Sequence, residues 1–239
     1  VPSTVVVATD VFDRFLDEND LRDFVINCAD EAEIHRRVIE APLPEETRLD
    51  LTAYIGQVGY PIAVRSSSLL EDSQYQPFTG VYETYMLPNN HPDPDVRLEQ
   101  LMRAVKGVYA STFTQHAKAY LRATPYRLEE EKMAVILQKI VGAAHGERFY
   151  PDFSGVARSY NFYPTGPLTS EDGIVAVALG LGRMVVDGGN VLRFCPKYPR
   201  HIVQFSSVAD ILENSQRDFW ALELKAGHLG MDPDHEMHE

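Results

Sequence analysis

The chain has 239 residues, of which 44% are hydrophobic and 24% are charged, and its formal net charge at pH 7 is −13. A chain this acidic will not bind nucleic acid through its overall field, so an anionic ligand would need a local cluster of donors or a metal ion. Its longest apolar stretch, 174–181, is far shorter than the roughly 20 residues of a membrane span, and its two cysteines form neither a metal spacing nor a disulfide framework. We therefore expect a globular cytoplasmic protein with neither nucleic acid nor membrane as partner.

The first half of the chain is predicted to be rich in helix. Asp10 is a good N-cap, and Asp30 and Pro44 mark two further helix starts. The expected elements are a strand at 5–8, helices beginning at Asp10 and covering 21–28, 31–39 and 45–58, a strand at 61–64, a loop at 66–78, a strand at 84–87, and helix across 95–121 with a break near Gly107.

The second half is predicted to be rich in strand. The expected strands cover 133–141, 155–160, 174–179, 191–194 and 219–224, with a short helix after Gly182. Long helices between separated strands favour an α+β (mixed α/β) class. The change in character suggests one domain over 1–239 with approximate subdomains at 1–125 and 126–225, followed by a tail at 226–239.

The sharpest local feature is an apolar strand that ends in an arginine and three serines, Arg65-Ser66-Ser67-Ser68. A guanidinium is a rigid fork of donors that matches phosphate oxygens, and the serines add hydroxyl and backbone donors. Arg65 and Ser66 are therefore candidates for a phosphate site. Composition alone favours an Arg65 that pairs with a carboxylate such as Glu71 or Asp72, and that alternative stays open.

Two further segments add weaker signals. Gly80 stands at a loop-to-strand junction, where the absence of a side chain would let a ligand approach the backbone, and Thr84 can donate a hydroxyl. Gln138 lies within an otherwise apolar strand, where its amide needs a partner. A purine edge and a neighbouring backbone group are both possible partners.

Taken in order, these motifs resemble the nucleotide-binding domain of phosphoenolpyruvate synthase, pyruvate phosphate dikinase and rifampin phosphotransferase. The resemblance spans roughly 1–194 and rests on five segments: 63–68 with Glu71-Asp72, 78–84, Gln138 on its strand, Ser154-Gly155-Val156-Ala157, and Gly180-Leu181-Gly182 with Val185-Val186 and Gly188. It implies an ATP-grasp fold in which two subdomains close over ATP and Mg²⁺. Members of the family pass a phosphoryl group from ATP to a histidine on another domain, or directly to a small substrate, so pyruvate or a similar acceptor is implied for the full-length protein.

The resemblance also implies roles for single residues. Arg65 would hold ATP phosphates and act in catalysis, Gly80 would let its backbone approach them, and Thr84 would add a donor. Gln138 would lie near the adenine. The sequence departs from the family at Arg183, where an acid is usual.

Because the chain opens directly into a strand, we expect a truncated domain. The resemblance implies a phosphate-binding lysine, metal ligands and an acceptor histidine that this sequence lacks, so we expect the domain to be inactive by itself. Two other hypotheses remain: an ATP-sensing regulatory module of a signalling protein, which Arg183 would suit, and a structural domain without a ligand.

Overall fold

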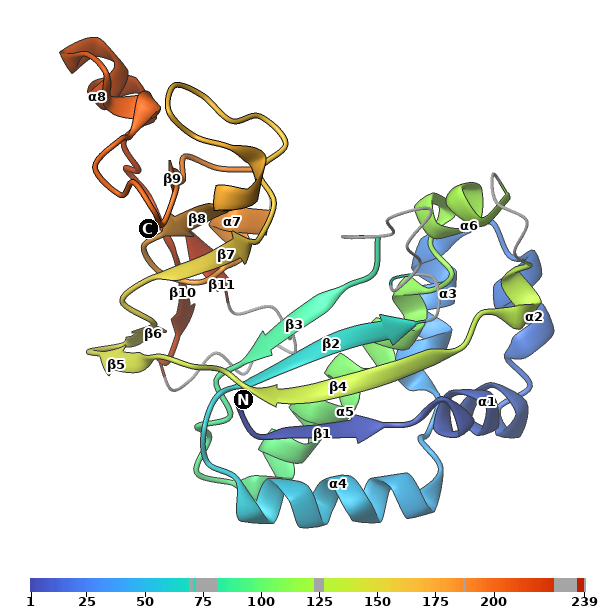
Figure 1. The fold of residues 1–239 in the computed structure, drawn as a ribbon. Helices are drawn as coiled ribbons and strands as arrows, with labels where there is room; N and C mark the ends of the chain where they lie inside the picture. Colours follow the sequence, from blue (N-terminus) through green and yellow to red (C-terminus); the bar gives the residue numbers. More distant parts are fainter. Residues whose placement is uncertain (69–70, 72–80, 123–126, 187, 226–235, 239) are drawn as a thin grey trace. The chain divides into compact units, whose positions relative to one another are not determined.

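The computed structural model describes residues 1–68, 71, 81–122, 127–186, 188–225 and 236–238, which form two compact units (Figure 1). The described residues of the first unit lie within 1–140, and those of the second lie within 141–225 and 236–238. Helices and antiparallel sheets together confirm the predicted α+β class. No helix in these described ranges is long and apolar enough to cross a membrane.

The first unit is a four-stranded antiparallel sheet with helices packed on one face (Figure 1). Its elements are β1 (Thr4–Val7), α1 (Thr9–Glu18), α2 (Arg22–Asn27), α3 (Glu31–Glu40), α4 (Glu45–Gln57), β2 (Ile62–Ser68), β3 (Thr84–Leu87), α5 (Pro94–Ser111), α6 (Gln115–Arg122), the 3₁₀ turn η1 (Leu128–Glu130) and β4 (Met133–Lys139). The strand order is β1-β4-β2-β3. Helix α5 packs across β2, β3 and β4, and α1 packs against β4.

Alternate residues of each strand point to opposite faces of this sheet. Val64, Val135 and Leu137 point toward the helices and are fully buried. The residues between them point to the other face, where Val6 is 54% exposed. The first unit therefore has one buried sheet face and one open sheet face.

The structure corrects the predicted start of the first helix and the predicted loop. The N-cap of α1 is Ala8, and Asp10 lies in the first turn. Strand β2 continues through Ser68, although a loop was expected from Ser66, because β4 pairs with it as far as Ser68 opposite Met133. The rest of the predicted loop, from position 69 to 78, lies outside the described residues except for Glu71.

The predicted break in the long helix lies at 112–114 instead of near Gly107. Gly107 lies within α5, and its lack of a side chain leaves room for the Tyr85 ring: an added Cβ would lie 2.6 Å from the Tyr85 hydroxyl oxygen. At the actual break, Thr114 accepts a hydrogen bond from the Ala117 N–H at 3.2 Å, which satisfies a donor at the start of α6.

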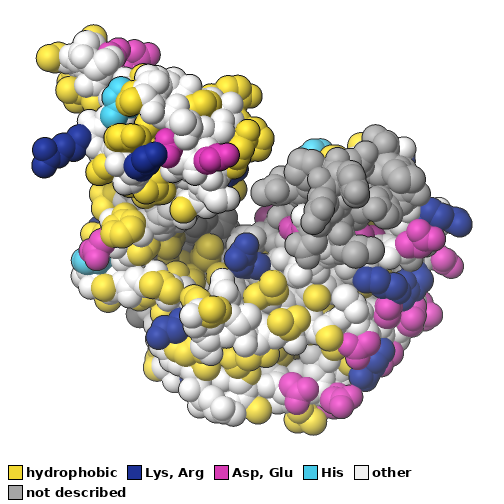
Figure 2. Space-filling model, in the orientation of Figure 1, with side chains coloured by type: hydrophobic (Ala, Val, Ile, Leu, Met, Phe, Trp, Pro, Cys, Tyr) yellow, Lys and Arg dark blue, Asp and Glu magenta, His cyan; other side chains and the backbone are white. Residues whose placement is uncertain are grey.

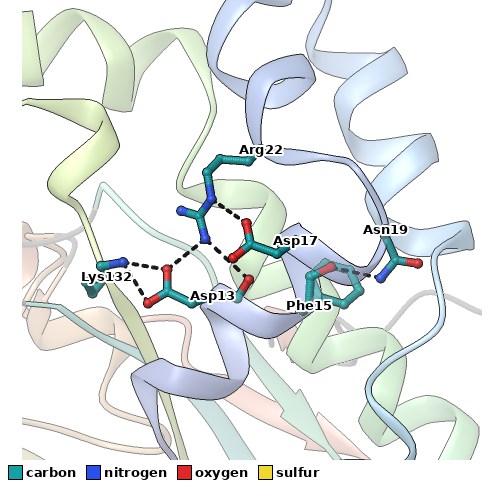
Figure 3. Close-up of polar contacts among 6 residues, drawn as sticks. All are labelled: Asp13, Phe15, Asp17, Asn19, Arg22 and Lys132. Atoms are coloured by element: carbon teal, nitrogen blue, oxygen red, sulfur yellow. Dashed lines mark hydrogen bonds and ion pairs between the residues drawn. The ribbon is translucent and has the colours of Figure 1, made fainter.

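A network of charged side chains joins α1 and α2 to the start of β4 (Figure 3). Arg22 donates to Asp17 at 2.6 Å and to Oδ1 of Asp13 at 2.9 Å. Lys132 donates to Oδ2 of Asp13 at 2.6 Å. Asp13 thus bridges cations from two other elements, and both of its oxygens are used.

The second unit contains two antiparallel sheets, of order β11-β10-β6-β5 and β7-β8-β9. Its elements are β5 (Ala143–His145), β6 (Arg148–Tyr150), β7 (Ser154–Arg158), η2 (Ser170–Asp172), β8 (Ile174–Ala178), α7 (Arg183–Val186), β9 (Leu192–Phe194), η3 (Val203–Phe205), α8 (Val208–Asn214), β10 (Trp220–Glu223) and β11 (Glu236–His238). The strands β7, β8, β9 and β10 confirm the predicted strands. The sequence analysis missed the β5–β6 hairpin, whose strands are too short to show a period.

The first unit ends after Ile140, later than the predicted subdomain boundary at 125/126. Strand β4 lies beyond that boundary, but it pairs with β1 and β2 and is the second strand of their sheet. Pairing between distant segments therefore determines where the first unit ends.

Candidate functional site

The open sheet face of the first unit brings together residues of four strands. Cross-strand partners in an antiparallel sheet project to the same side, so the register defines two rows. One row is Thr4, Gln138, Ala63 and Met86, and the next is Val6, Ile136, Arg65 and Thr84. Three predicted site residues, Arg65, Thr84 and Gln138, therefore lie on one face although they belong to three strands.

Polar contacts link the middle of this face. Nη1 of Arg65 lies 3.5 Å from Oε1 of Gln138, and Nε2 of Gln138 lies 3.3 Å from the hydroxyl oxygen of Thr4. The distance from Arg65 is at the upper limit of a hydrogen bond, so this contact is weak. The Gln138 amide thus pairs with side chains, whereas the sequence left a backbone partner open.

The described residues give the Arg65 guanidinium no carboxylate partner. Glu71, one of the two acids considered, accepts from the Ser66 hydroxyl at 2.8 Å and from the Ser68 N–H at 3.2 Å. Asp72 lies outside the described residues. The exposed guanidinium therefore keeps most of its five donors available for an anion.

Two predicted site residues are not seen with the others. Ser66 alternates with Arg65 along β2, so its side chain points to the opposite face, where it binds Glu71. Gly80 lies outside the described residues. The structure thus brings together Arg65, Thr84 and Gln138, and it separates Ser66 from them.

The open sheet face also carries apolar residues beside its polar groups. Val6, Ile136, Ala63 and Met86 complete the two rows that contain Thr4, Arg65, Thr84 and Gln138. Figure 2 shows apolar side chains at the surface over β1, β4 and β2, with Lys or Arg side chains beside them. A flat apolar surface next to an arginine can receive an aromatic ring and an anionic group of the same ligand.

A buried glutamate, Glu131, binds the segment just before β3 through Tyr82. The sequence did not predict this residue. The Tyr82 hydroxyl donates to Oε1 of Glu131 at 3.0 Å, and the two residues are 6% and 5% exposed. Burial raises the pKa of Glu131, while hydrogen bonds from Ser68 and Tyr82 oppose that rise. Tyr82 is two residues before Thr84, so this contact helps to position Thr84. In the sequence, Glu131 belongs to the charged run 129–132, which is typical of a solvated surface.

Two of the glycine-containing motifs lie in the second unit. Their glycines pack closely against backbone atoms of other segments. A Cβ added to Gly155 would lie 2.6 Å from the Ala176 carbonyl oxygen, and one added to Gly180, at φ +81°, would lie 2.6 Å from that of Trp220. Both glycines are therefore needed for close backbone packing. The guanidinium of Arg183 lies 4.4 Å from the centre of the Trp220 ring, which gives this departure from the family pattern a packing role.

No group of three or more His, Cys, Asp or Glu side chains that could hold a metal ion occurs in the described part of the chain.

A comparison with known protein families finds a match that covers most of the chain. Residues 1–206 match the family described as pyruvate phosphate dikinase, AMP/ATP-binding domain. This range includes every residue of the open sheet face.

Several characterised or named proteins are similar to the chain. The uncharacterized phosphotransferase YvkC of Bacillus subtilis is 27% identical over 79% of this chain and 20% of its own length. A phosphoenolpyruvate synthase of Aeropyrum pernix is 28% identical over 89% of this chain and 26% of its own length. A rifampicin phosphotransferase of Bacillus cereus is 24% identical over 65% of this chain and 16% of its own length. The matched part of the chain thus spans about a quarter or less of each of these relatives.

Proposed function

Because the chain belongs to the pyruvate phosphate dikinase AMP/ATP-binding domain family, we propose that the open sheet face of its first unit forms part of the ATP site of a phosphoenolpyruvate synthase-like phosphotransferase. The observation that carries this proposal is the placement of Arg65, Thr84 and Gln138 on one face by the register of three strands. That face offers an arginine without a carboxylate partner among the described residues, together with hydroxyl, amide and apolar groups.

Each of these residues has a distinct role in the proposal. The Arg65 guanidinium binds phosphate oxygens and stabilises the charge that moves during phosphoryl transfer, which is most of what this reaction requires of a protein. The Thr84 hydroxyl adds a donor, and the Gln138 amide faces the adenosine part. ATP would replace the long contact between Arg65 and Gln138, so the two side chains would separate toward the two ends of the nucleotide.

The other predicted ligands enter the proposal differently. Gly80 would let the phosphates approach its backbone. Ser66 would act through Glu71, by holding the end of β2 that carries Arg65. ATP brings Mg²⁺ with it, and in the proposal this ion binds to the phosphates.

The reaction of the whole protein extends the proposal further. Relatives named as phosphoenolpyruvate synthase and as rifampicin phosphotransferase point to a phosphoryl transfer whose acceptor is a histidine or a small molecule such as pyruvate. We propose that this ATP-dependent reaction takes place in the cytoplasm.

Calorimetry with Mg-ATP tests the site. We expect the 239-residue chain to bind ATP, and Arg65→Gln to weaken binding about tenfold to hundredfold, since a hydrogen bond to a charged group contributes about 1.5–3 kcal/mol. Arg36→Gln is the matched control, because Arg36 is an exposed arginine on α3 that pairs with Glu33 and Glu40. Equal ATP affinity of the Arg65 and Arg36 variants would refute the proposal.

A further inference from the structure

The second unit contains a hollow lined by five consecutive residues, Lys197, Tyr198, Pro199, Arg200 and His201. It is a depression of about 480 Å³ that is largely open to solvent. Three of the five side chains are basic, in a chain whose net charge is −13. This hollow shares no residue with the open sheet face of the first unit.

Two successive turns shape the hollow after β9. The Tyr198 N–H donates to the Cys195 carbonyl at 3.0 Å, and the His201 N–H donates to the Tyr198 carbonyl at 3.0 Å. Cys195 is 2% exposed, so the first turn is anchored in the core of the second unit. The basic side chains therefore project from a backbone that is held by its own hydrogen bonds.

The loop at 165–168 approaches this segment closely. Gly166 has φ +59°, and a Cβ added to it would lie 3.1 Å from Nε2 of His201. A side chain at position 166 would thus crowd the imidazole, and its backbone conformation favours glycine. Glycine at position 166 therefore leaves space for the His201 ring beside the hollow.

The charges of the hollow are only partly compensated. Lys197 donates to Oδ1 of Asp172 at 2.7 Å, and this ammonium, with hydrogen bonds from Thr169, lowers the pKa of Asp172 to about 2. Asp172 is therefore ionised at neutral pH and balances Lys197. Among the described residues, neither the Arg200 guanidinium nor the His201 ring has a hydrogen-bonding or ion-pairing partner.

We propose that this hollow is a second ligand site, which binds a phosphorylated small molecule with its phosphate group against Arg200 and His201. Arginine matches phosphate oxygens with two parallel donors, imidazole adds another donor, and Lys197 keeps donors beyond its bond to Asp172. The uncompensated Arg200 guanidinium and the neighbouring imidazole and ammonium donors suit the several oxygens of a phosphate better than the two oxygens of a carboxylate. The volume beyond one phosphate, beside the Tyr198 ring, leaves room for the organic part of the ligand.

This inference is independent of the proposed ATP site, and NMR titration of the ¹⁵N-labelled 239-residue chain tests it. Inorganic phosphate is the probe, with acetate at equal ionic strength in a parallel titration. We expect saturable amide shifts at 197–201 with phosphate, and at least tenfold weaker binding in Arg200→Gln and in His201→Gln. Arg217→Gln is the matched control, because Arg217 belongs to the same unit, does not line the hollow, and donates to the Leu212 carbonyl.

The titration also separates this site from the first one. Arg65→Gln should leave the phosphate shifts at 197–201 unchanged, even though it weakens ATP binding. Because Arg200 and His201 are both exposed, we expect their variants to fold, and the dispersion of the amide spectrum checks this. Shifts that do not saturate, shifts of equal size with acetate, or equal affinity of the Arg200 and Arg217 variants would overturn the proposal.

Discussion

Nη1 of Arg65 lies 3.5 Å from Oε1 of Gln138, although the two residues are 73 positions apart in the chain. The contact follows from the pairing of β2 with β4, which sets Arg65 opposite Ile136 and Ala63 opposite Gln138. A shift of this register by one residue would send one of the two side chains to the helix-covered face. The proposed nucleotide site therefore depends on one strand pairing.

Thr84→Val should weaken ATP binding by up to about tenfold, because a neutral hydrogen bond contributes about 0.5–1.5 kcal/mol. Valine has nearly the shape of threonine, so β3 should keep its structure. Calorimetry measures the change, with Thr52→Val as control, since the Thr52 hydroxyl bonds within α4 to the Arg48 carbonyl. Unchanged affinity in Thr84→Val would remove Thr84 from the site.

The two faces of β4 should respond differently to truncation. Leu137→Ala should lower the free energy of unfolding by about 2–5 kcal/mol, since Leu137 is fully buried and its loss leaves a cavity. Ile136→Ala should lower the free energy of unfolding by less, because Ile136 lies on the open sheet face and is only half-buried. Urea denaturation of both variants gives the comparison. A larger loss at Ile136 would contradict the assignment of the faces.

Gly107→Ala should destabilise the protein, although alanine is normally the better helix former. The new methyl group would meet the Tyr85 ring at under 3 Å. In α4, Gly56 has no atom within 4 Å of the added Cβ, so Gly56→Ala should stabilise the protein by about 0.5–1 kcal/mol. Thermal unfolding compares the two variants, and a gain at both positions would show that the Tyr85 contact does not constrain α5.

The Glu131 carboxyl should make stability fall as the pH rises above 4.5. Burial raises its pKa in the folded protein above the ordinary value of 4.5. Between these two pKa values the folded state keeps a proton that the unfolded state releases, so the contribution is full below pH 4.5 and is lost through the folded pKa. Glu131→Gln lacks this loss and keeps an oxygen for the Tyr82 hydroxyl.

Denaturation at a series of pH values checks this prediction. As the pH rises above 4.5, the free energy of unfolding of Glu131→Gln should fall less than that of the wild type. Glu130→Gln is the matched control, because the adjacent Glu130 is exposed. Parallel curves for wild type and Glu131→Gln would contradict the prediction.

The network around Asp13 should contribute modestly to stability (Figure 3). Lys132→Met should lower the free energy of unfolding by about 0.5–1 kcal/mol at low salt, because both partners are partly exposed. A double-mutant cycle of Lys132→Met with Asp13→Asn isolates the pair, and its coupling should shrink at 1 M salt. Additive effects of the two substitutions would show that the pair contributes nothing.

Local signals in the sequence predicted much of the fold. Asp30 begins α3 as expected, and its carboxylate accepts from the N–H groups of Ala32 and Glu33 at 3.0 and 3.2 Å. The strand at 84–87 has the predicted bounds, and the ordered motifs around Arg65 and Gln138 identified the family. These features depend on neighbours in the chain, so they can be recognised without coordinates.

By itself, the sequence determined the α+β class, the family, and Arg65, Thr84 and Gln138 as candidate ligands. Only the tertiary structure decided that these three share a face, that Ser66 points away from it, and that Glu131 is buried. The physical reason is that side-chain direction in a strand alternates with every residue. The face that each residue takes therefore depends on pairing and packing with segments far away in the chain.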